Sequence, residues 1–324
     1  NDTRHDQVLA AECMVLRNGN TLWRETMPAR VYGPAENLAF TSRYRAPLFD
    51  EQTSLTFRVK LTDGSGAVLD TWDAPLTIFP RNQDFTLPTT AAMYDPDGTM
   101  TALLTSRGIK GLSFLEDLSD LRALKQLTVL WVNFDKAKLH ARLWQQVLPV
   151  LRDFVTQGGT IILDSPPEFA WNDLPVKLNN GKGYAADGRL EITYDYNIAP
   201  HHPAMHQLSD DDFSLWGSDY YLAHRCFEIP QEGNVRPLLV AGTDRAGLTS
   251  SPLMELPCGQ GAWIVSTLEL VNKLAQEPRC AQLLQQIITA AHAPKNKLAK
   301  SVGLCVTPDT LRIMREVEIG RAHV

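Results

Sequence analysis

The sequence predicts a multidomain protein in which an all-β sandwich precedes an α/β domain. A length of 324 residues is typical of about two domains. Residues 1–80 contain short strand patterns separated by turns, the arrangement of a small antiparallel sandwich. Over residues 84–293, strand and helix patterns alternate, the arrangement of an α/β domain. These observations place the domain boundary between residues 80 and 84.

The first domain is predicted from alternating apolar residues. In "LTFRVKL" every second residue is apolar, and side chains two apart share one face of a strand. The four residues of this face are Leu55, Phe57, Val59 and Leu61. The next turn, "DGSG", supplies residues that tolerate a positive φ in a hairpin. Strands connected in this way favour a sandwich over a helical domain.

The second domain is predicted from buried strands and amphipathic helices. "TTAAMY" and "IKGLSFL" read as strands on either side of a short helix near 98–107. "LTVLWVN" (127–133) and "TIILD" (160–164) are continuous apolar runs, typical of strands buried on both faces. Between them, apolar residues recur every three or four positions from Leu139 to Phe154, as on one face of a helix. This strand–helix–strand unit predicts a parallel sheet with a right-handed crossover.

Later elements are shorter. "RLEITYDY", "HRCFEIP" and "PLLVAG" read as strands, and "SPLMELPCGQGAWIVSTLEL" as a hairpin that turns at 258–261. "EPRCAQLLQQIITAAHA" predicts a final helix with Pro278 in its first turn, where proline is tolerated. Residues 300–317 resemble the truncated start of a further α/β unit. Residues 318–324, "EIGRAHV", fit a sequencing adapter read in frame and are excluded from fold reasoning. We therefore expect a natural chain that continues beyond both ends.

The composition argues against several classes of function. Lys plus Arg number 31 and Asp plus Glu 37, and the net charge of −6 gives no support to nucleic-acid binding. No apolar run approaches the roughly 20 residues that span a bilayer. Five cysteines are scattered without a CxxC pair, which argues against a disulfide framework and a structural zinc site. We expect no metal ion and no cofactor.

The segment "HPAMHQLSDDDFSLW" has two interpretations. In the structural one, Ser209 caps a helix, Asp212 completes a capping box, and Phe213 and Trp216 pack inward from one helical face. The acidic residues then lie at the positive end of the helix dipole. In the functional one, His202, Asp212 and Trp216 form a ligand site. The sequence leaves both interpretations open.

The segment "TIILDSPPEF" lies where a buried strand passes into a loop. Ligands bind at the carboxyl ends of strands in open parallel sheets, so Asp164 and Ser165 are ligand-binding candidates. A nucleophile elbow at this place would carry Gly-x-Ser-x-Gly or a cysteine equivalent. Pro166 and Pro167 stand here instead, and we expect them to prevent the tight positive-φ turn that presents a nucleophile.

The order of these segments resembles a known family. "NDT" at the start, "RAPLF" (45–49) and "LTDGSGAVLDTWDAPLTIFP" (61–80) resemble the immunoglobulin-like domain that follows the catalytic barrel of glycoside hydrolase family 2 proteins. "MYDPDG", "LRDFVTQGGTIILD", "HPAMHQLSDDDFSLW" and "GQGAWIVSTLELVNKLAQEPRCAQLLQQII" resemble the class I glutamine amidotransferase-like domain of many bacterial members. The resemblance covers about residues 1–293. It implies an immunoglobulin-like sandwich, a flavodoxin-like α/β domain, a role in carbohydrate metabolism, and a periplasmic or extracellular location.

The sequence also departs from that family. No Asn-Glu dipeptide, the family's usual acid/base position, occurs in the chain. The elbow cysteine of true amidotransferases is replaced by Asp164-Ser165. We therefore expect no catalytic residue and predict a non-catalytic accessory region of a glycoside hydrolase. Its role would be structural, oligomerising or weakly carbohydrate-binding, and its partners the catalytic barrel of the same full-length protein and further copies of itself.

Two other functions stay open. The first is an independent hydrolase or amidotransferase-like enzyme that uses Asp164, Ser165 and His202. A serine or cysteine within hydrogen-bond reach of a histidine would indicate it. The second is a carbohydrate-binding module, which would need a flat, exposed aromatic platform of tryptophan or tyrosine.

Overall fold

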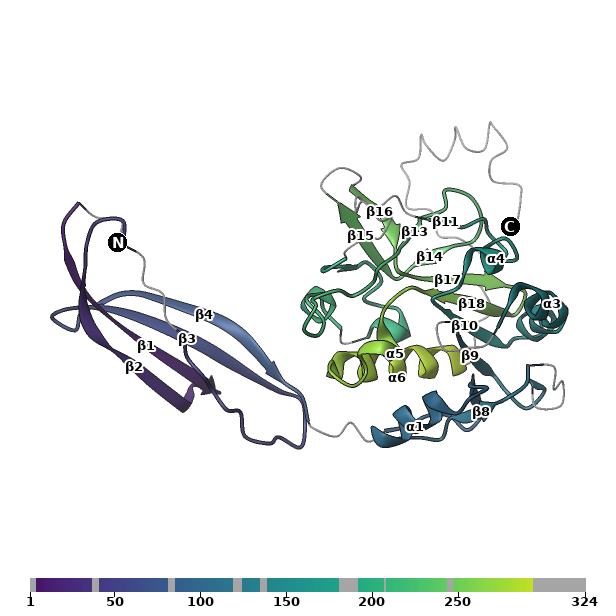
Figure 1. Cartoon of the computed structure of the whole chain (residues 1–324), viewed down its shortest axis with the longest axis horizontal. Coiled ribbons are helices and arrows are strands. Elements are labelled where there is room, and N and C mark those ends of the chain that lie inside the picture. Colours follow the sequence, from purple (N-terminus) through teal and green to yellow (C-terminus); the bar gives the residue numbers. More distant parts are fainter. Residues whose placement is uncertain are drawn as a thin grey trace, which may run out of the picture. The chain divides into compact units, whose positions relative to one another are not determined.

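The computed structural model of the chain describes residues 4–36, 41–80, 85–118, 124–134, 139–180, 192–206, 208–243 and 247–293. The chain divides into two compact units, Asn1–Asn82 and Gln83–Val324 (Figure 1). The predicted further α/β unit at 300–317 and the tail at 318–324 lie outside the described residues. No helix in the described ranges is long and apolar enough to cross a membrane.

The first unit contains one antiparallel sheet with the strand order β2–β1–β3–β4. Its strands are β1 (Gln7–Arg17), β2 (Asn20–Tyr32), β3 (Thr53–Asp63) and β4 (Val68–Ile78). The predicted all-β character is confirmed. The predicted sandwich also needs a second sheet, and residues 4–36 and 41–80 contain only this one. The alternation in β3 predicted a strand with one apolar face, which does not reveal whether another sheet covers that face.

The two faces of the sheet in the first unit differ in the side chains they carry. Cys13 pairs with Val59, and Val59 with Trp72, so these side chains project from the same face. On the opposite face Arg58 donates two hydrogen bonds of 2.7 Å to the Asp73 carboxylate. Cys13 on the inner strand is 1% exposed, whereas Trp72 on the edge strand is 58% exposed. This face is thus buried on the inner strand and exposed on the edge strand.

The second unit is built around a seven-stranded mixed sheet with the order β14–β17–β18–β10–β9–β6–β8. The five strands from β18 to β8 run parallel, and β17 and β14 run antiparallel to their neighbours. The parallel pairing of β9 with β10 confirms the predicted strand–helix–strand unit. The strands are β6 (Ala91–Tyr94), β8 (Ser113–Leu115), β9 (Val129–Asn133), β10 (Thr160–Asp164), β14 (Arg236–Pro237), β17 (Leu253–Cys258) and β18 (Gly261–Ser266).

Both faces of this sheet are buried, because alternate side chains enter two separate cores. Ile162 of β10 packs in one core with Met100 of α1 and Ile287 of α6. Leu163 packs in the other core with Leu151 of α3. The helices are α1 (Thr99–Ser106), α3 (Ala141–Thr156), α4 (Glu168–Trp171), α5 (Leu270–Lys273) and α6 (Pro278–His292). Helix α6 begins at Pro278, as predicted. A flavodoxin-like architecture remains a prediction.

Shorter elements complete the second unit. A five-stranded sheet has the order β11–β13–β16–β15–β12, and β5 pairs with β7. Two 3-10 helices, η1 (Pro203–Met205) and η2 (Asp210–Phe213), lie in the segment of the expected Ser209 helix. The strands are β5 (Phe85–Thr86), β7 (Ile109–Lys110), β11 (Asn179–Asn180), β12 (Tyr196–Asn197), β13 (Phe227–Glu228), β15 (Leu239–Thr243) and β16 (Gly247–Ser251).

The boundary between the units predicts where a protease cuts. Few contacts cross between compact units, so trypsin at low concentration should cleave at Arg81 before it cleaves within either unit. Mass spectrometry of the first fragments would locate the cut. First cleavage inside residues 91–293, with residues 78–85 intact, would contradict this division.

Candidate functional site

The parallel strands of the second unit end in a row of buried polar residues. Asp95 follows β6, Asn133 ends β9, Asp164 ends β10 and Ser266 ends β18, and all are at most 3% exposed. Asp164 is paired in register with Asn133 on one side and Ser266 on the other. The carboxyl ends of such strands are the usual place for ligands in open α/β sheets. This edge is therefore the first candidate site.

The carboxylates of this edge hold the chain's own groups. The Asp95 carboxylate accepts hydrogen bonds from the backbone N–H groups of Met100 and Thr101, at 3.2 and 2.8 Å, at the start of α1. It also accepts one from the Thr101 hydroxyl at 2.6 Å. The Asn133 Nδ2 group donates to Asp164 Oδ2 at 3.1 Å. Asp95 is thus a helix cap, and Asn133 orients Asp164.

Ser165 corrects a prediction from the sequence. We expected Pro166 and Pro167 to prevent a positive-φ turn after β10, but Ser165 itself has a φ of 51°. Proline fixes its own φ and disfavours the right-handed α region for the residue before it, and neither effect excludes the left-handed region. The Ser165 N–H donates to the Ser266 carbonyl at 2.8 Å, which holds the turn. The backbone therefore has the geometry of a strand-to-helix elbow, with α4 following.

A serine nucleophile also needs a base within about 2.6–3.2 Å. In the part of the chain that the structure describes, no hydrogen bond joins the Ser165 hydroxyl to a histidine. His202 instead places Nε2 at 3.6 Å from Glu255 Oε2, and Glu255 is 3.1 Å from the guanidinium of Arg236. His202 Nδ1 accepts the Ala204 N–H at 3.2 Å, so Nε2 carries the proton in the neutral ring. His202 thus anchors the start of η1.

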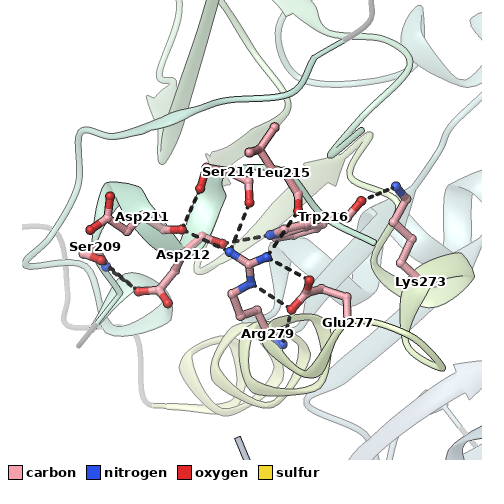
Figure 2. Close-up of polar contacts among 9 residues, drawn as sticks. All are labelled: Ser209, Asp211, Asp212, Ser214, Leu215, Trp216, Lys273, Glu277 and Arg279. Carbon is pink, nitrogen blue, oxygen red and sulfur yellow. Dashed lines mark hydrogen bonds and ion pairs between the residues drawn. The ribbon is translucent and has the colours of Figure 1, made fainter. Parts of the chain in front are cut away.

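The segment "SDDDFSLW" starts with the predicted capping box. The N–H and hydroxyl groups of Ser209 donate to the Asp212 carboxylate at 2.9 and 3.0 Å (Figure 2). The helix that follows is the 3-10 helix η2, which ends at Phe213. Trp216 lies beyond it and donates its indole N–H to the Asp212 carbonyl at 2.8 Å. Phe213 and Trp216 are 1% and 0% exposed, so both rings pack inward as expected, but they do not share a helical face, because η2 ends at Phe213.

Arg279 of α6 binds the backbone of residues 211–215. Its guanidinium donates to the backbone carbonyls of Asp211, Ser214 and Leu215, at 3.0, 3.1 and 3.5 Å (Figure 2). It also donates two hydrogen bonds, of 2.7 and 2.8 Å, to the Glu277 carboxylate. Burial favours a higher pKa for Glu277, but the hydrogen bonds and charge of Arg279 outweigh it and lower that pKa. We call Arg279 and its four hydrogen-bond partners, together with Lys273, the guanidinium clasp.

Lys273 of α5 adds a second cation to the clasp. Its ammonium group donates to the Trp216 carbonyl at 2.9 Å and forms an ion pair with Asp219. Lys273 is 7% exposed. Lys273, Glu277 and Arg279 were not predicted from the sequence. The signal that could have found them is that "DDFSLW" and "STLELVNKLAQEPR" both carry the sequence resemblance described above, and in the structure the two segments are in contact.

Asp195 is a further buried acid, which was not predicted from the sequence. It is 0% exposed, and neither carboxylate oxygen has a hydrogen-bond partner among the described residues. Burial raises the pKa of Asp195 well above its ordinary value. Burial, with the nearby Asp195 carboxyl adding to it, also raises the pKa of the Cys226 thiol. Burial thus favours the protonated form of Asp195 in the folded protein.

The structure distributes the five predicted ligand-binding residues over three places. Asp164 and Ser165 lie at the end of β10, His202 lies beside Glu255, and Asp212 and Trp216 belong to the segment held by the guanidinium clasp. Trp216 is 0% exposed in this structure. The described residues contain no cluster of three or more His, Cys, Asp or Glu that could hold a metal ion. Ligand binding by these five residues remains a prediction.

Comparisons with known proteins give low similarities. No family model matches the chain, and no curated protein matches it. The structure is similar to a cytoplasmic protein of Salmonella typhimurium LT2, with 9% identity and a TM-score of 0.41, over 74% of this chain and 96% of that one. It is similar to a β-galactosidase from Bacillus circulans sp. alkalophilus, with 12% identity and a TM-score of 0.35, over 65% of this chain and 31% of that one.

A third similar structure is an exo-β-1,4-mannosidase from Opitutaceae bacterium strain TAV5, with 11% identity and a TM-score of 0.34. The match covers 64% of this chain and 36% of the mannosidase. This chain therefore spans about a third of the length of both glycosidases.

The guanidinium clasp predicts a large effect of Arg279→Ala on stability. The substitution leaves the largely buried Glu277 carboxylate and the loop carbonyls without their donor, so the free energy of unfolding should fall by roughly 3 kcal/mol. The matched control is Arg152→Ala, whose side chain is 54% exposed and pairs with Asp173 at 3.8 Å. That change should cost at most about 1 kcal/mol. Urea denaturation followed by tryptophan fluorescence measures both, and equal losses would contradict the role of the clasp.

Asp195 predicts a pH dependence. Its pKa is raised in the folded state, so its stabilising contribution is complete below the unfolded pKa and is lost as the pH rises toward the folded pKa. The stability of Asp195→Asn relative to the wild-type protein should therefore rise as the pH is raised from about 4, the ordinary aspartate pKa, to neutrality. Thermal unfolding at several pH values measures this, with the exposed Asp211→Asn as control. A stability difference that stays constant over this range would show that Asp195 does not titrate in this way.

Proposed function

We propose that this chain is a non-catalytic accessory region of a larger glycoside hydrolase. One observation carries the proposal: the polar residues of its most enzyme-like segment bind the chain's own backbone. Asp212 caps η2, Arg279 binds three carbonyls of the same segment, and Lys273 binds a fourth. A segment with these partners is a structural support. The sequence resemblance to glycoside hydrolase family 2 proteins supports the carbohydrate context.

Glycoside hydrolysis needs two carboxyl groups on either side of a reachable bond. They stand about 5–5.5 Å apart in retaining enzymes and about 6.5–9.5 Å apart in inverting ones. Among the described residues of the second unit, the buried carboxyl groups have other environments: Asp95 caps α1, Glu255 lies between His202 and an arginine, and Glu277 binds Arg279. Asp164 accepts a hydrogen bond from Asn133, and Asp195 is enclosed in the core. These contacts support a role in which the second unit stabilises or assembles the enzyme, or binds carbohydrate weakly, while a catalytic barrel of the same full-length protein performs the chemistry. A periplasmic or extracellular location follows from the family resemblance and belongs to this proposal.

A second candidate function is an independent hydrolase or amidotransferase that uses Asp164, Ser165 and His202. The left-handed backbone of Ser165 favours it, because a strained non-glycine residue at a strand end is common at active sites. The proton of His202 Nε2, however, faces Glu255. This function would require His202, or another base, to reach Ser165.

An activity screen separates the two candidates. The whole chain is incubated with aryl glycosides, aryl esters and glutamine, beside Ser165→Ala and the matched control Ser106→Ala, an exposed serine of α1. We expect turnover no higher than that of buffer for all three proteins. Hydrolysis that Ser165→Ala abolishes, while Ser106→Ala keeps it and both variants unfold at the wild-type temperature, would establish the enzyme and overturn the accessory role.

A further inference from the structure

We propose that Tyr194, Tyr196, Asp210 and Asp211 form a binding surface for the guanidinium group of an arginine side chain presented by a partner protein. We call these four residues the tyrosine–aspartate surface. The inference goes beyond the accessory role and does not depend on it. It rests on two exposed aromatic rings, two carboxylates that lack a cation, and a rigid backbone beneath them.

The two tyrosines form an exposed aromatic corner. They are two residues apart in an extended segment, so both side chains project from the same face, while Asp195 between them points into the core. Tyr194 is 39% exposed and Tyr196 is 42% exposed. Their ring centroids are 4.8 Å apart with an interplanar angle of 72°. The two rings thus form an edge-to-face pair in which both tyrosines are open to solvent.

Two carboxylates lie beside this corner. The Tyr194 backbone is bridged to Ser214, and the Asp195 N–H donates to the Phe213 carbonyl, so η2 lies against the tyrosine segment. Asp210 Oδ1 accepts the N–H of Asn197 at 2.7 Å, which fixes that carboxylate next to β12. Partial burial, and after it the charge of Asp210, raises the pKa of Tyr194, as expected for a carboxylate close to the ring.

The negative charge of this surface is not balanced locally. Among the described residues neither Asp210 nor Asp211 forms an ion pair, although two cations lie nearby. Arg279 is bound by Glu277 and by backbone carbonyls, and Lys273 is paired with Asp219. The rings and the carboxylates therefore both attract a cation, the rings through their negative π-faces.

A guanidinium group fits this combination better than the alternatives do. It is planar, stacks on aromatic faces, and presents a fork of N–H donors that matches a carboxylate. An ammonium group is more strongly hydrated and cannot stack. A neutral sugar could stack on one of the rings, but it carries no charge for the two carboxylates to attract. Because the surface is exposed, we assign the guanidinium to an arginine in an extended segment of a partner, whose backbone supplies further contacts.

The backbone beneath the surface is fixed before a partner binds. Leu215, 57% exposed and next to Ser214, has a φ of 51°. Its N–H donates to the Thr193 carbonyl at 2.9 Å, and its own carbonyl accepts from Arg279. The guanidinium clasp thus fixes the left-handed backbone of Leu215 before a partner binds. Little conformational entropy is therefore lost from this segment on binding.

The test uses three blocked tripeptides, Ala-X-Ala, in which X is arginine, lysine or citrulline, the uncharged isostere of arginine. Binding to the isotope-labelled whole chain is followed by NMR shifts of the Tyr194 and Tyr196 resonances. We expect the arginine peptide to bind, the lysine peptide to bind more weakly and the citrulline peptide not to bind. Tyr196→Ala should weaken arginine binding roughly threefold to tenfold, and so should the double change Asp210→Asn, Asp211→Asn. Higher salt should also weaken it, because the surface is exposed.

The matched control is Tyr220→Asn. Tyr220 is 57% exposed with a φ of 66°, which asparagine tolerates, and its loss should leave arginine binding unchanged. Equal binding of the citrulline and arginine peptides would show that charge does not matter and overturn the proposal. Equal binding of the lysine peptide would reduce the surface to a general attraction for cations and overturn the guanidinium assignment. Shifts with methyl β-galactoside but none with arginine would assign the surface to a sugar, and no shift with any probe would overturn it entirely.

Discussion

The second unit depends on satisfying backbone carbonyls in a segment that has little regular structure. Between β12 and β13 the chain forms two 3-10 helices and isolated bridges, and such backbone leaves many acceptors without a ladder partner. Arg279 supplies donors for three of these carbonyls and Lys273 for a fourth. Both cations come from helices that pack on the large sheet. The segment between β12 and β13 is therefore fixed to α5 and α6 by charge-assisted hydrogen bonds as well as by apolar contacts.

This arrangement explains why the segment richest in chemical groups resembles an active site. Carboxylates, cations and aromatic rings gather wherever a polar loop must be held against an apolar core. In the guanidinium clasp, Glu277 orients Arg279 in the way that a carboxylate orients a catalytic side chain. The groups that Arg279 binds, however, are peptide carbonyls of the same chain. The carboxyl end of the parallel sheet repeats the pattern: Asp95 and Asn133 are buried at the strand ends, and both bind neighbouring parts of the fold.

Much of the fold was predictable because local pattern determines it. β9 and β10 appear in the sequence as continuous apolar runs, and α3 and α6 as apolar residues that recur every three or four positions. Each pattern reflects the burial of a single strand or helix. The box at Ser209 also lies within four residues. Arg279 and its carbonyl partners are 64 to 68 residues apart, and no periodicity links such positions. The sequence likewise did not show that η2 ends at Phe213 or that Ser165 is left-handed, because tertiary hydrogen bonds decide both.

Ser165 bears on how a fold of this kind gains or loses chemistry. Its backbone already has the bent, left-handed form that presents a side chain at the end of a central strand, and a hydrogen bond to Ser266 holds that form independently of the side chain. A cysteine differs from this serine by a single atom, the sulfur that replaces Oγ. The shape of the main chain at this position is therefore set independently of which of these two reactive atoms the side chain carries.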